Sequence, residues 1–168
     1  MRILLADDHG LMLTGARLTL EADGFEIVGE AQSGPQVLPL VARTNPEVVL
    51  LDLRMPGIDG LECLSRIRDR HPEVKVVMCS MSNDADQIQG AFRRGACGYI
   101  LKTIDPIDLG SAIRQAVYGT AFHAPSTGLV TLEIDGLIQR YVQTTATREV
   151  DGRELLVYNY DGEVRPEQ

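Results

Sequence analysis

The sequence predicts an α/β fold in which helices cover a five-stranded parallel sheet. Short β-type runs alternate with helical patterns from the first residue to about residue 119, and this alternation is typical of parallel sheets. The 168 residues are 44% hydrophobic and 24% charged, an ordinary globular composition that can bury a core. We therefore expect one main domain with a small appendage.

Five β-type runs and five helical segments account for this alternation. The runs are Ile3–Ala6, Glu26–Glu30, Val48–Leu51, Val74–Cys79 and Gly98–Leu101. Each is followed by apolar residues at helical spacing, which are Leu11, Gly15 and Leu18, then Val37, Leu40 and Val41, then Leu61, Leu64 and Ile67, then Ile88, Ala91 and Phe92, and finally Leu109, Ile113, Ala116 and Val117. The fifth helix is predicted to open at Asp105-Pro106, a cap followed by proline.

Polar residues follow four of the five runs directly. They are Asp7 and Asp8, Asp52, Ser80 and Lys102. Because such sheets bind or react at the carboxyl ends of their strands, where the strand order reverses, we expect these five side chains to converge on one edge.

The converging carboxylates need a positive partner. Two carboxylates about 4 Å apart repel by roughly 4 kcal/mol at an effective dielectric constant of 20. A cluster of oxygen ligands suits Mg²⁺, the usual ion where a phosphoryl group is handled. The Lys102 ammonium and the Ser80 hydroxyl would neutralise phosphoryl oxygens beside it.

Three segments resemble the receiver domain of bacterial two-component response regulators. They are Asp7-Asp8-His9, the stretch from Leu51 to Gly60 (LDLRMPGIDG), and the stretch from Gly95 to Lys102 (GACGYILK). The resemblance covers residues 1 to about 120 and implies a flavodoxin-like (βα)5 receiver fold. The most similar subfamily joins its receiver to a LuxR-type helix-turn-helix DNA-binding domain.

The resemblance also implies roles for individual residues. Asp52 matches the phosphoryl acceptor, which attacks the phosphohistidine of a sensor histidine kinase. Asp8 and Asp52, with Asp7 and the carbonyl of Arg54, would hold Mg²⁺. A ligand role for His9 is an alternative, although histidine is common after paired aspartates in this subfamily.

The remaining roles concern the switch. Ser80 matches the hydroxyl that moves toward the phosphoryl group, Tyr99 the aromatic residue that follows it inward, and Lys102 the ammonium. Phosphorylation would then shift a two-state surface of the fourth helix, fifth strand and fifth helix. Thr103 stands where the family often has proline.

Residues 121–168 depart from the DNA-binding subfamily. They hold four Arg and no Lys against eight acidic residues, so they lack the basic residues that a recognition helix needs. Asp-Gly pairs at 135–136, 151–152 and 161–162, flanked by β-prone residues, predict β-hairpins. Such a meander should pack on the receiver or pair across a homodimer. A largely flexible segment from Pro125 to Gln168 is the alternative.

Composition limits location and partners. The formal net charge is -8, which does not favour general electrostatic binding to nucleic acid. No apolar run reaches the roughly 18 residues of a membrane helix, and we expect a cytoplasmic protein. The three cysteines, Cys63, Cys79 and Cys97, have no ligand spacing and are expected to be buried, reduced thiols.

Three functions fit the sequence. The leading one is a response regulator, not a turnover enzyme, whose output is protein contact. The second is a transcription regulator with a truncated or divergent helix-turn-helix, supported only by Arg148-Glu149-Val150, a faint match to the start of that domain. The third is a Mg²⁺-dependent phosphatase, but Arg54 stands where it would need a second acid/base carboxylate.

Overall fold

The computed structural model describes residues 1–118, 120–123, 129–134, 137–150 and 153–159, with side chains for residues 1–118. Its N-terminal part is the predicted α/β fold, with a parallel sheet in the order β2-β1-β3-β4-β5. The five strands begin and end within one residue of the predicted runs, at β1 Arg2–Ala6, β2 Glu26–Ala31, β3 Val48–Asp52, β4 Lys75–Ser80 and β5 Gly98–Leu101.

Helices follow each strand, as the sequence predicts. They are α1 Gly10–Ala22, α2 Gly34–Thr44, α3 Gly60–Arg70, α4 Ala85–Arg93 and α5 Leu109–Tyr118. A 3-10 turn, η1 (Pro106–Asp108), leads into α5, and the Asp105 carboxylate caps it by accepting the Ile107 amide at 3.1 Å. The fifth helix therefore opens where predicted, but its first turn is tighter than an α-helix.

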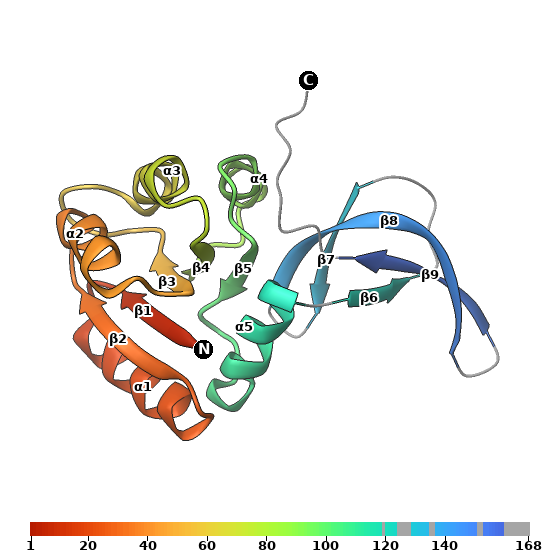
Figure 1. The fold of residues 1–168 in the computed structure, drawn as a ribbon, viewed down its shortest axis with the longest axis horizontal. Helices are drawn as coiled ribbons and strands as arrows, with labels where there is room; N and C mark the ends of the chain where they lie inside the picture. Colours follow the sequence, from red (N-terminus) through yellow and green to blue (C-terminus); the bar gives the residue numbers. More distant parts are fainter. Residues whose placement is uncertain (119, 124–128, 135–136, 151–152, 160–168) are drawn as a thin grey trace.

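Two hydrophobic cores lie on opposite faces of the sheet. Helices α2, α3 and α4 pack on one face, and α1 and α5 pack on the other (Figure 1). The buried apolar residues of the helices after α1 are largely those that the spacing predicts, such as Ile67 in α3 and Ile113 in α5. Every strand that lies between two helical layers is consequently rich in buried branched side chains.

The first helix forms where the sequence predicts it, but the residues that mark it in the sequence are not the ones that the core buries. The sequence spacing chose Leu11, Gly15 and Leu18, yet Leu11 is 86% exposed and Leu18 62% exposed. The residues that pack on the sheet are Leu13 and Leu20. Apolar residues lie on both sides of this helix, so periodicity alone could not tell which stripe faces the core.

The strand order reverses between β1 and β3. The chain goes from β1 outward to β2 and then crosses to β3 on the other side of β1. In the parallel register, Ala6 lies beside Leu51, so the residues that follow them, Asp7 and Asp52, emerge next to each other. This is where sheets of this class bind their ligands.

The C-terminal strands continue the same sheet. They are β6 Thr120–His123, β7 Leu129–Ile134, β8 Leu137–Val150 and β9 Arg153–Asn159. Antiparallel pairing of β7 with β8 and of β8 with β9 matches the hairpins predicted around residues 135–136 and 151–152. The third predicted hairpin, at 161–162, lies outside the described residues. The described strands cover most of residues 129–159.

The extension packs on the receiver, as one of the two predicted arrangements requires. Strand β8 pairs antiparallel with β5, with Tyr99 opposite Ile138 and Ile100 opposite Leu137. The blue strand β8 in Figure 1 therefore begins at the edge of the green strand β5. Among the described residues, no helix is both long enough and apolar enough to cross a membrane.

Candidate functional site

A lysine bridges two aspartates at the carboxyl ends of the strands. The Lys102 Nζ lies 2.7 Å from Asp7 Oδ2 and 2.9 Å from Asp52 Oδ2. The Lys102 side chain is only 5% exposed. Burial alone would lower the pKa of Lys102, but the hydrogen bonds and charges of Asp7 and Asp52 outweigh it and raise that pKa above its usual value. The ammonium is therefore a fixed positive charge at neutral pH.

Asp52 is the last residue of β3 and is buried. Its Oδ1 accepts the backbone amide of Arg54 at 3.3 Å, while its Oδ2 faces Lys102. Burial raises the pKa of Asp52, the nearby charge of Asp7 adds to this, and Lys102 counteracts it only in part. A second cation near Asp52 would therefore stabilise its ionised form further.

The β3–α3 loop is held tightly against this strand end. Gly60 begins α3, and its amide donates to the Leu53 carbonyl at 2.8 Å. A Cβ at Gly60 would collide with the backbone of Asp52 and Leu53. The loop that carries Arg54 is thus fixed by a close approach that only glycine permits.

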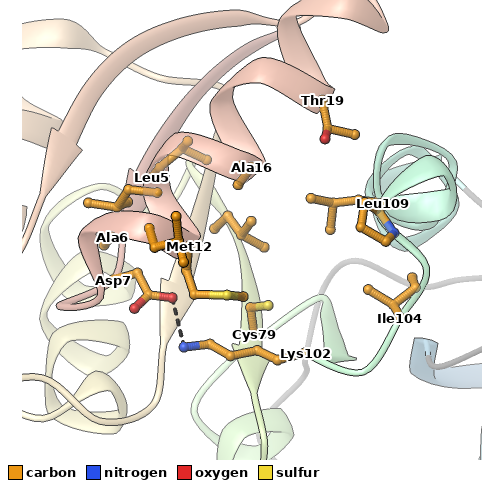
Figure 2. A pocket seen from close by; sticks show the side chains of 15 residues that line it. Leu5, Ala6, Asp7, Met12, Ala16, Thr19, Cys79, Lys102, Ile104 and Leu109 are labelled. Atoms are coloured by element: carbon orange, nitrogen blue, oxygen red, sulfur yellow. Dashed lines mark ion pairs between the residues drawn. The ribbon is translucent and has the colours of Figure 1, made fainter.

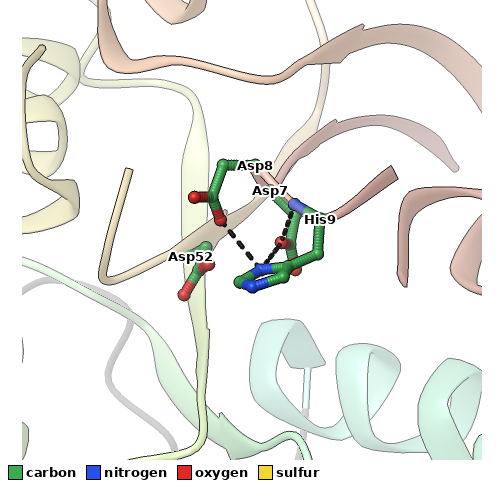
Figure 3. A group of neighbouring side chains, drawn as sticks. All are labelled: Asp7, Asp8, His9 and Asp52. Atoms are coloured by element: carbon green, nitrogen blue, oxygen red, sulfur yellow. Dashed lines mark hydrogen bonds and ion pairs between the residues drawn. The ribbon is translucent and has the colours of Figure 1, made fainter. Parts of the chain in front are cut away.

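Three polar residues after β1 complete the acidic cluster (Figure 3). His9 Nδ1 lies 3.1 Å from Asp7 Oδ1 and 2.9 Å from Asp8 Oδ1. Asp7, Asp8, His9 and Asp52 each offer one ligand atom, and these atoms all lie within 4.8 Å of one another. The Asp8 side chain is 35% exposed, so the cluster opens toward solvent on that side.

This donor set fits Mg²⁺. The three carboxylates supply hard oxygen ligands, and the partly exposed side leaves room for water, which Mg²⁺ usually retains. The imidazole of His9 is the softer member of the cluster and would also suit a transition metal. A divalent cation bound here would stabilise the ionised form of Asp52, which burial and the charge of Asp7 disfavour.

The switch candidates Ser80 and Tyr99 meet in the β4–α4 loop. The Ser80 Oγ accepts the amide of Ser82 at 3.1 Å, and the Tyr99 hydroxyl donates to the Ser82 carbonyl at 2.7 Å. The Tyr99 side chain is fully buried, and burial raises its pKa. The ring therefore points inward, and both side chains are tied to one residue of the same loop.

A cavity of about 280 Å³ lies beside the acidic cluster, between α1 and the η1–α5 segment (Figure 2). Asp7 and Lys102 form its polar end, and apolar side chains line most of the remainder. Cys79 lines it and is partly exposed, which corrects the expectation of full burial; Cys63 and Cys97 are buried, and all three thiols are free. Burial raises the pKa of Cys79 to about 12, so this thiol stays protonated at neutral pH.

The structure brings together Asp7, Asp8, Asp52 and Lys102. Ser80, at the end of β4, and Tyr99, in β5, both bond Ser82 in the loop that follows β4. Sequence reasoning missed two features of the site. The anchoring of Tyr99 through the Ser82 carbonyl carries no sequence signal, because any residue could offer that carbonyl. The apolar cavity depends on how α1 packs against the η1–α5 segment, and a helical pattern within one stretch of sequence does not show this.

Comparison with known proteins places this geometry in a family. Residues 3–114 match the response regulator receiver domain. The chain is 41% identical over 118 residues to the nitrate/nitrite response regulator protein NarL of Escherichia coli K12, covering 70% of this chain and 55% of NarL. It is 33% identical over 157 residues to the transcriptional regulatory protein DegU of Brevibacillus brevis, covering 92% of this chain and 64% of DegU.

A solved receiver has the same fold. The isolated REC domain of RcsB from Salmonella enterica serovar Typhimurium, solved in the presence of phosphomimetic BeF3-, superimposes with a TM-score of 0.63 and 27% identity, covering 67% of this chain and 85% of that one. The chain spans just over half of NarL and under two thirds of DegU. With the bridged aspartates at the ends of β1 and β3 and a family match over two thirds of its length, the chain belongs to the response regulator receiver domain family.

Proposed function

We propose that this chain accepts a phosphoryl group on Asp52 from the phosphohistidine of a sensor histidine kinase. The observation that carries the proposal is the pairing of the Asp52 carboxylate with the buried Lys102 ammonium at 2.9 Å, beside the Asp7 and Asp8 carboxylates. The Lys102 ammonium and three carboxylates lie where the strand order reverses. Together they could hold a phosphoryl group next to a divalent cation.

The proposed step is one group transfer. An Asp52 carboxylate oxygen attacks the phosphorus, the phosphorus–nitrogen bond of the donor breaks, and the imidazole leaves with the electron pair and its own proton. Asp7, Asp8, Asp52 and the Arg54 carbonyl would hold Mg²⁺, which when bound neutralises phosphoryl charge. Lys102 and the Ser80 hydroxyl would bind the remaining phosphoryl oxygens.

The product is a modified protein and not a released compound, so the chain is proposed to act as a switch, catalysing its own phosphorylation and dephosphorylation. Ser80 and Tyr99 would change the surface formed by α4, β5 and α5, and the output would be protein contact, with homodimerisation as one form. We assign residues 1–120 to the receiver and 121–168 to an extension.

The kinase would approach over an apolar rim. Leu11, Met12 and Ile107 are 86%, 41% and 79% exposed, and Leu11 and Met12 also line the cavity beside Asp7 and Lys102. Exposed apolar residues gathered beside a reactive site commonly mark a protein contact. Replacing Leu11 by serine should slow transfer from a kinase that phosphorylates the wild-type chain and leave transfer from acetyl phosphate unchanged.

A DNA-binding transcriptional regulator is the second candidate. One observation favours it, because the match to the transcriptional regulatory protein DegU covers 92% of this chain and so reaches beyond the receiver. Against it, the described residues after 119 form strands and contain no helix that could enter a DNA groove. Residues 121–168 also carry a net charge of -4, from four Arg and eight acidic residues. Salt-dependent, sequence-selective DNA binding by the full chain would support it.

The decisive experiment measures phosphorylation directly. The full chain is incubated with acetyl phosphate, with Mg²⁺ or EDTA, and its intact mass is measured. We expect one added phosphoryl group with Mg²⁺ and none with EDTA. Asp52→Asn should abolish the addition, whereas the control Asp59→Asn should retain it, because the Asp59 carboxylate caps α3 outside the cluster. Retained acyl phosphate formation in Asp52→Asn would contradict the assignment.

A further inference from the structure

The edge of the receiver sheet is occupied by the chain's own extension. Strand β5 is the last parallel strand, and its outer side pairs with the first two residues of β8. Adding a strand to an exposed edge is a common way for one chain segment to occupy a recognition surface. Here the added strand comes from the same chain, 36 residues after β5 ends.

The junction is much shorter than the other pairings of β8. Strand β8 aligns two residues with β5 but six with β7 and six with β9. A ladder of two residue pairs can open without disturbing the hairpins on either side of it. The β5–β8 junction, which joins the extension to the receiver sheet, is therefore the shortest of the three pairings that β8 makes.

One of the two β5 residues in the junction is Tyr99. Its backbone lies opposite Ile138, while its hydroxyl donates to the Ser82 carbonyl and the Ser82 amide donates to Ser80 Oγ. A change at Ser80 is thus two hydrogen bonds away from the strand that β8 covers. These contacts run from Ser80 to the sheet edge. The Lys102 amide donates to the Ser80 carbonyl at 2.8 Å, which joins Ser80 to the residue that bridges Asp7 and Asp52.

We infer that β8 is an intramolecular cover for the β5 edge and that its pairing is coupled to occupancy of the acidic site. A phosphoryl group on Asp52 would compete for the Ser80 hydroxyl, loosen the Ser82 loop and shift Tyr99, which weakens the β5–β8 junction. The released edge then becomes available to a partner strand. This inference rests on the proposed phosphorylation of Asp52.

Coupling of this kind acts in both directions. If phosphorylation weakens the junction, then breaking the junction must make the phosphorylated form easier to reach. Beryllofluoride with Mg²⁺, a stable mimic of the phosphoryl group, should therefore bind more tightly when β8 cannot pair with β5. It should also increase amide exchange in β5 of the unaltered chain.

The test uses proline variants of the full chain in matched pairs. Leu137→Pro and Ile138→Pro lie in the β5 register, whereas Gln139→Pro and Arg140→Pro lie two residues further along β8 and remain in the β7 register. Amides two residues apart in a strand face the same neighbour, so each variant has a control with the same amide direction. Hydrogen exchange is measured on a peptide covering 98–101, with and without beryllofluoride.

We expect faster exchange of residues 98–101 in at least one junction variant than in its control, by about tenfold, the change expected for one lost backbone hydrogen bond. That variant should also bind beryllofluoride several-fold more tightly. If residues 98–101 exchanged at the same rate in each junction variant and its control, the inference that β8 covers the β5 edge would be overturned. Equal beryllofluoride affinity with different exchange would overturn the coupling, and protection that depends on protein concentration would assign the covering strand to a second copy.

Failure of the proposed phosphorylation gives a different result. If no variant binds beryllofluoride or is phosphorylated, the proposed function fails, whereas faster exchange in a junction variant without any ligand still establishes the cover. A circular dichroism spectrum of each variant identifies any that fail to fold. The Asp52→Asn chain, which should not bind beryllofluoride, should keep its β5 protection when the mimic is added.

Discussion

Replacing Lys102 by methionine should destabilise the metal-free protein and make its stability depend on Mg²⁺. Methionine keeps most of the apolar stem but removes the ammonium that bonds Asp7 and Asp52 at 2.7 and 2.9 Å. Ligand oxygens of these aspartates lie within 4.8 Å, where two charges repel by about 3.5 kcal/mol at an effective dielectric constant of 20. Removing one partner of a buried ion pair typically costs about 3–5 kcal/mol.

We therefore expect a loss of about 3 kcal/mol in the free energy of unfolding, measured by urea denaturation in EDTA at pH 7.5. Mg²⁺ should restore most of it, because the cation replaces the missing charge; an ion present at 100 times its Kd stabilises by about 2.7 kcal/mol. The control is Lys75→Met, the other lysine of the chain, which starts β4 outside the cluster.

The pH dependence gives the sign of the effect. Burial and the charge of Asp7 raise the pKa of Asp52, and the variant loses the Lys102 interactions that lower it. Ionisation of Asp52 therefore costs stability above that pKa, and the cost disappears as the pH falls below the unfolded value near 4. The difference between Lys102→Met and wild type should therefore shrink toward pH 4. Two results would refute this reasoning. One is a Lys102→Met chain that is as stable in EDTA as Lys75→Met, and the other is a loss of unfolding free energy relative to wild type that grows as the pH falls.

Four further substitutions, one of which is a control, test other parts of the structure. Leu13→Ala should lower the free energy of unfolding by about 2–5 kcal/mol, because it opens a cavity in the core. The control Leu18→Ala, at an exposed position, should change that free energy by less than about 0.5 kcal/mol. If urea denaturation gave the larger loss for Leu18→Ala, the side of α1 that carries Leu18 would be the buried one. Gly60→Ala should abolish phosphorylation by acetyl phosphate, as measured by intact mass, since its Cβ would displace the backbone of Asp52; full phosphorylation would mean that the loop tolerates the change. Tyr99→Phe leaves a loop carbonyl without its donor and should cost about 1 kcal/mol in the same denaturation assay, and no loss would mean that water replaces the hydroxyl.

The sequence alone predicted the parallel sheet, the boundaries of its strands and the residues that meet at its edge. This succeeded because four of the five strand ends are marked locally, by a polar residue directly after an apolar run, as in Leu51-Asp52. The strand switch point then requires such residues to converge, whatever the loops do. Hairpins of the extension were predictable for the same reason, since Asp-Gly turns are set by local backbone preference.

Tertiary structure decided the rest. Which side of α1 is buried depends on packing against α5, and a helix with apolar residues on both sides does not encode this choice locally. The anchoring of Tyr99 uses a backbone carbonyl, which every residue has. The pairing of β8 with β5 joins segments far apart in the chain, and an open strand edge accepts any strand of suitable length. Local preference fixes the elements, whereas non-local contacts choose between their alternative faces and partners.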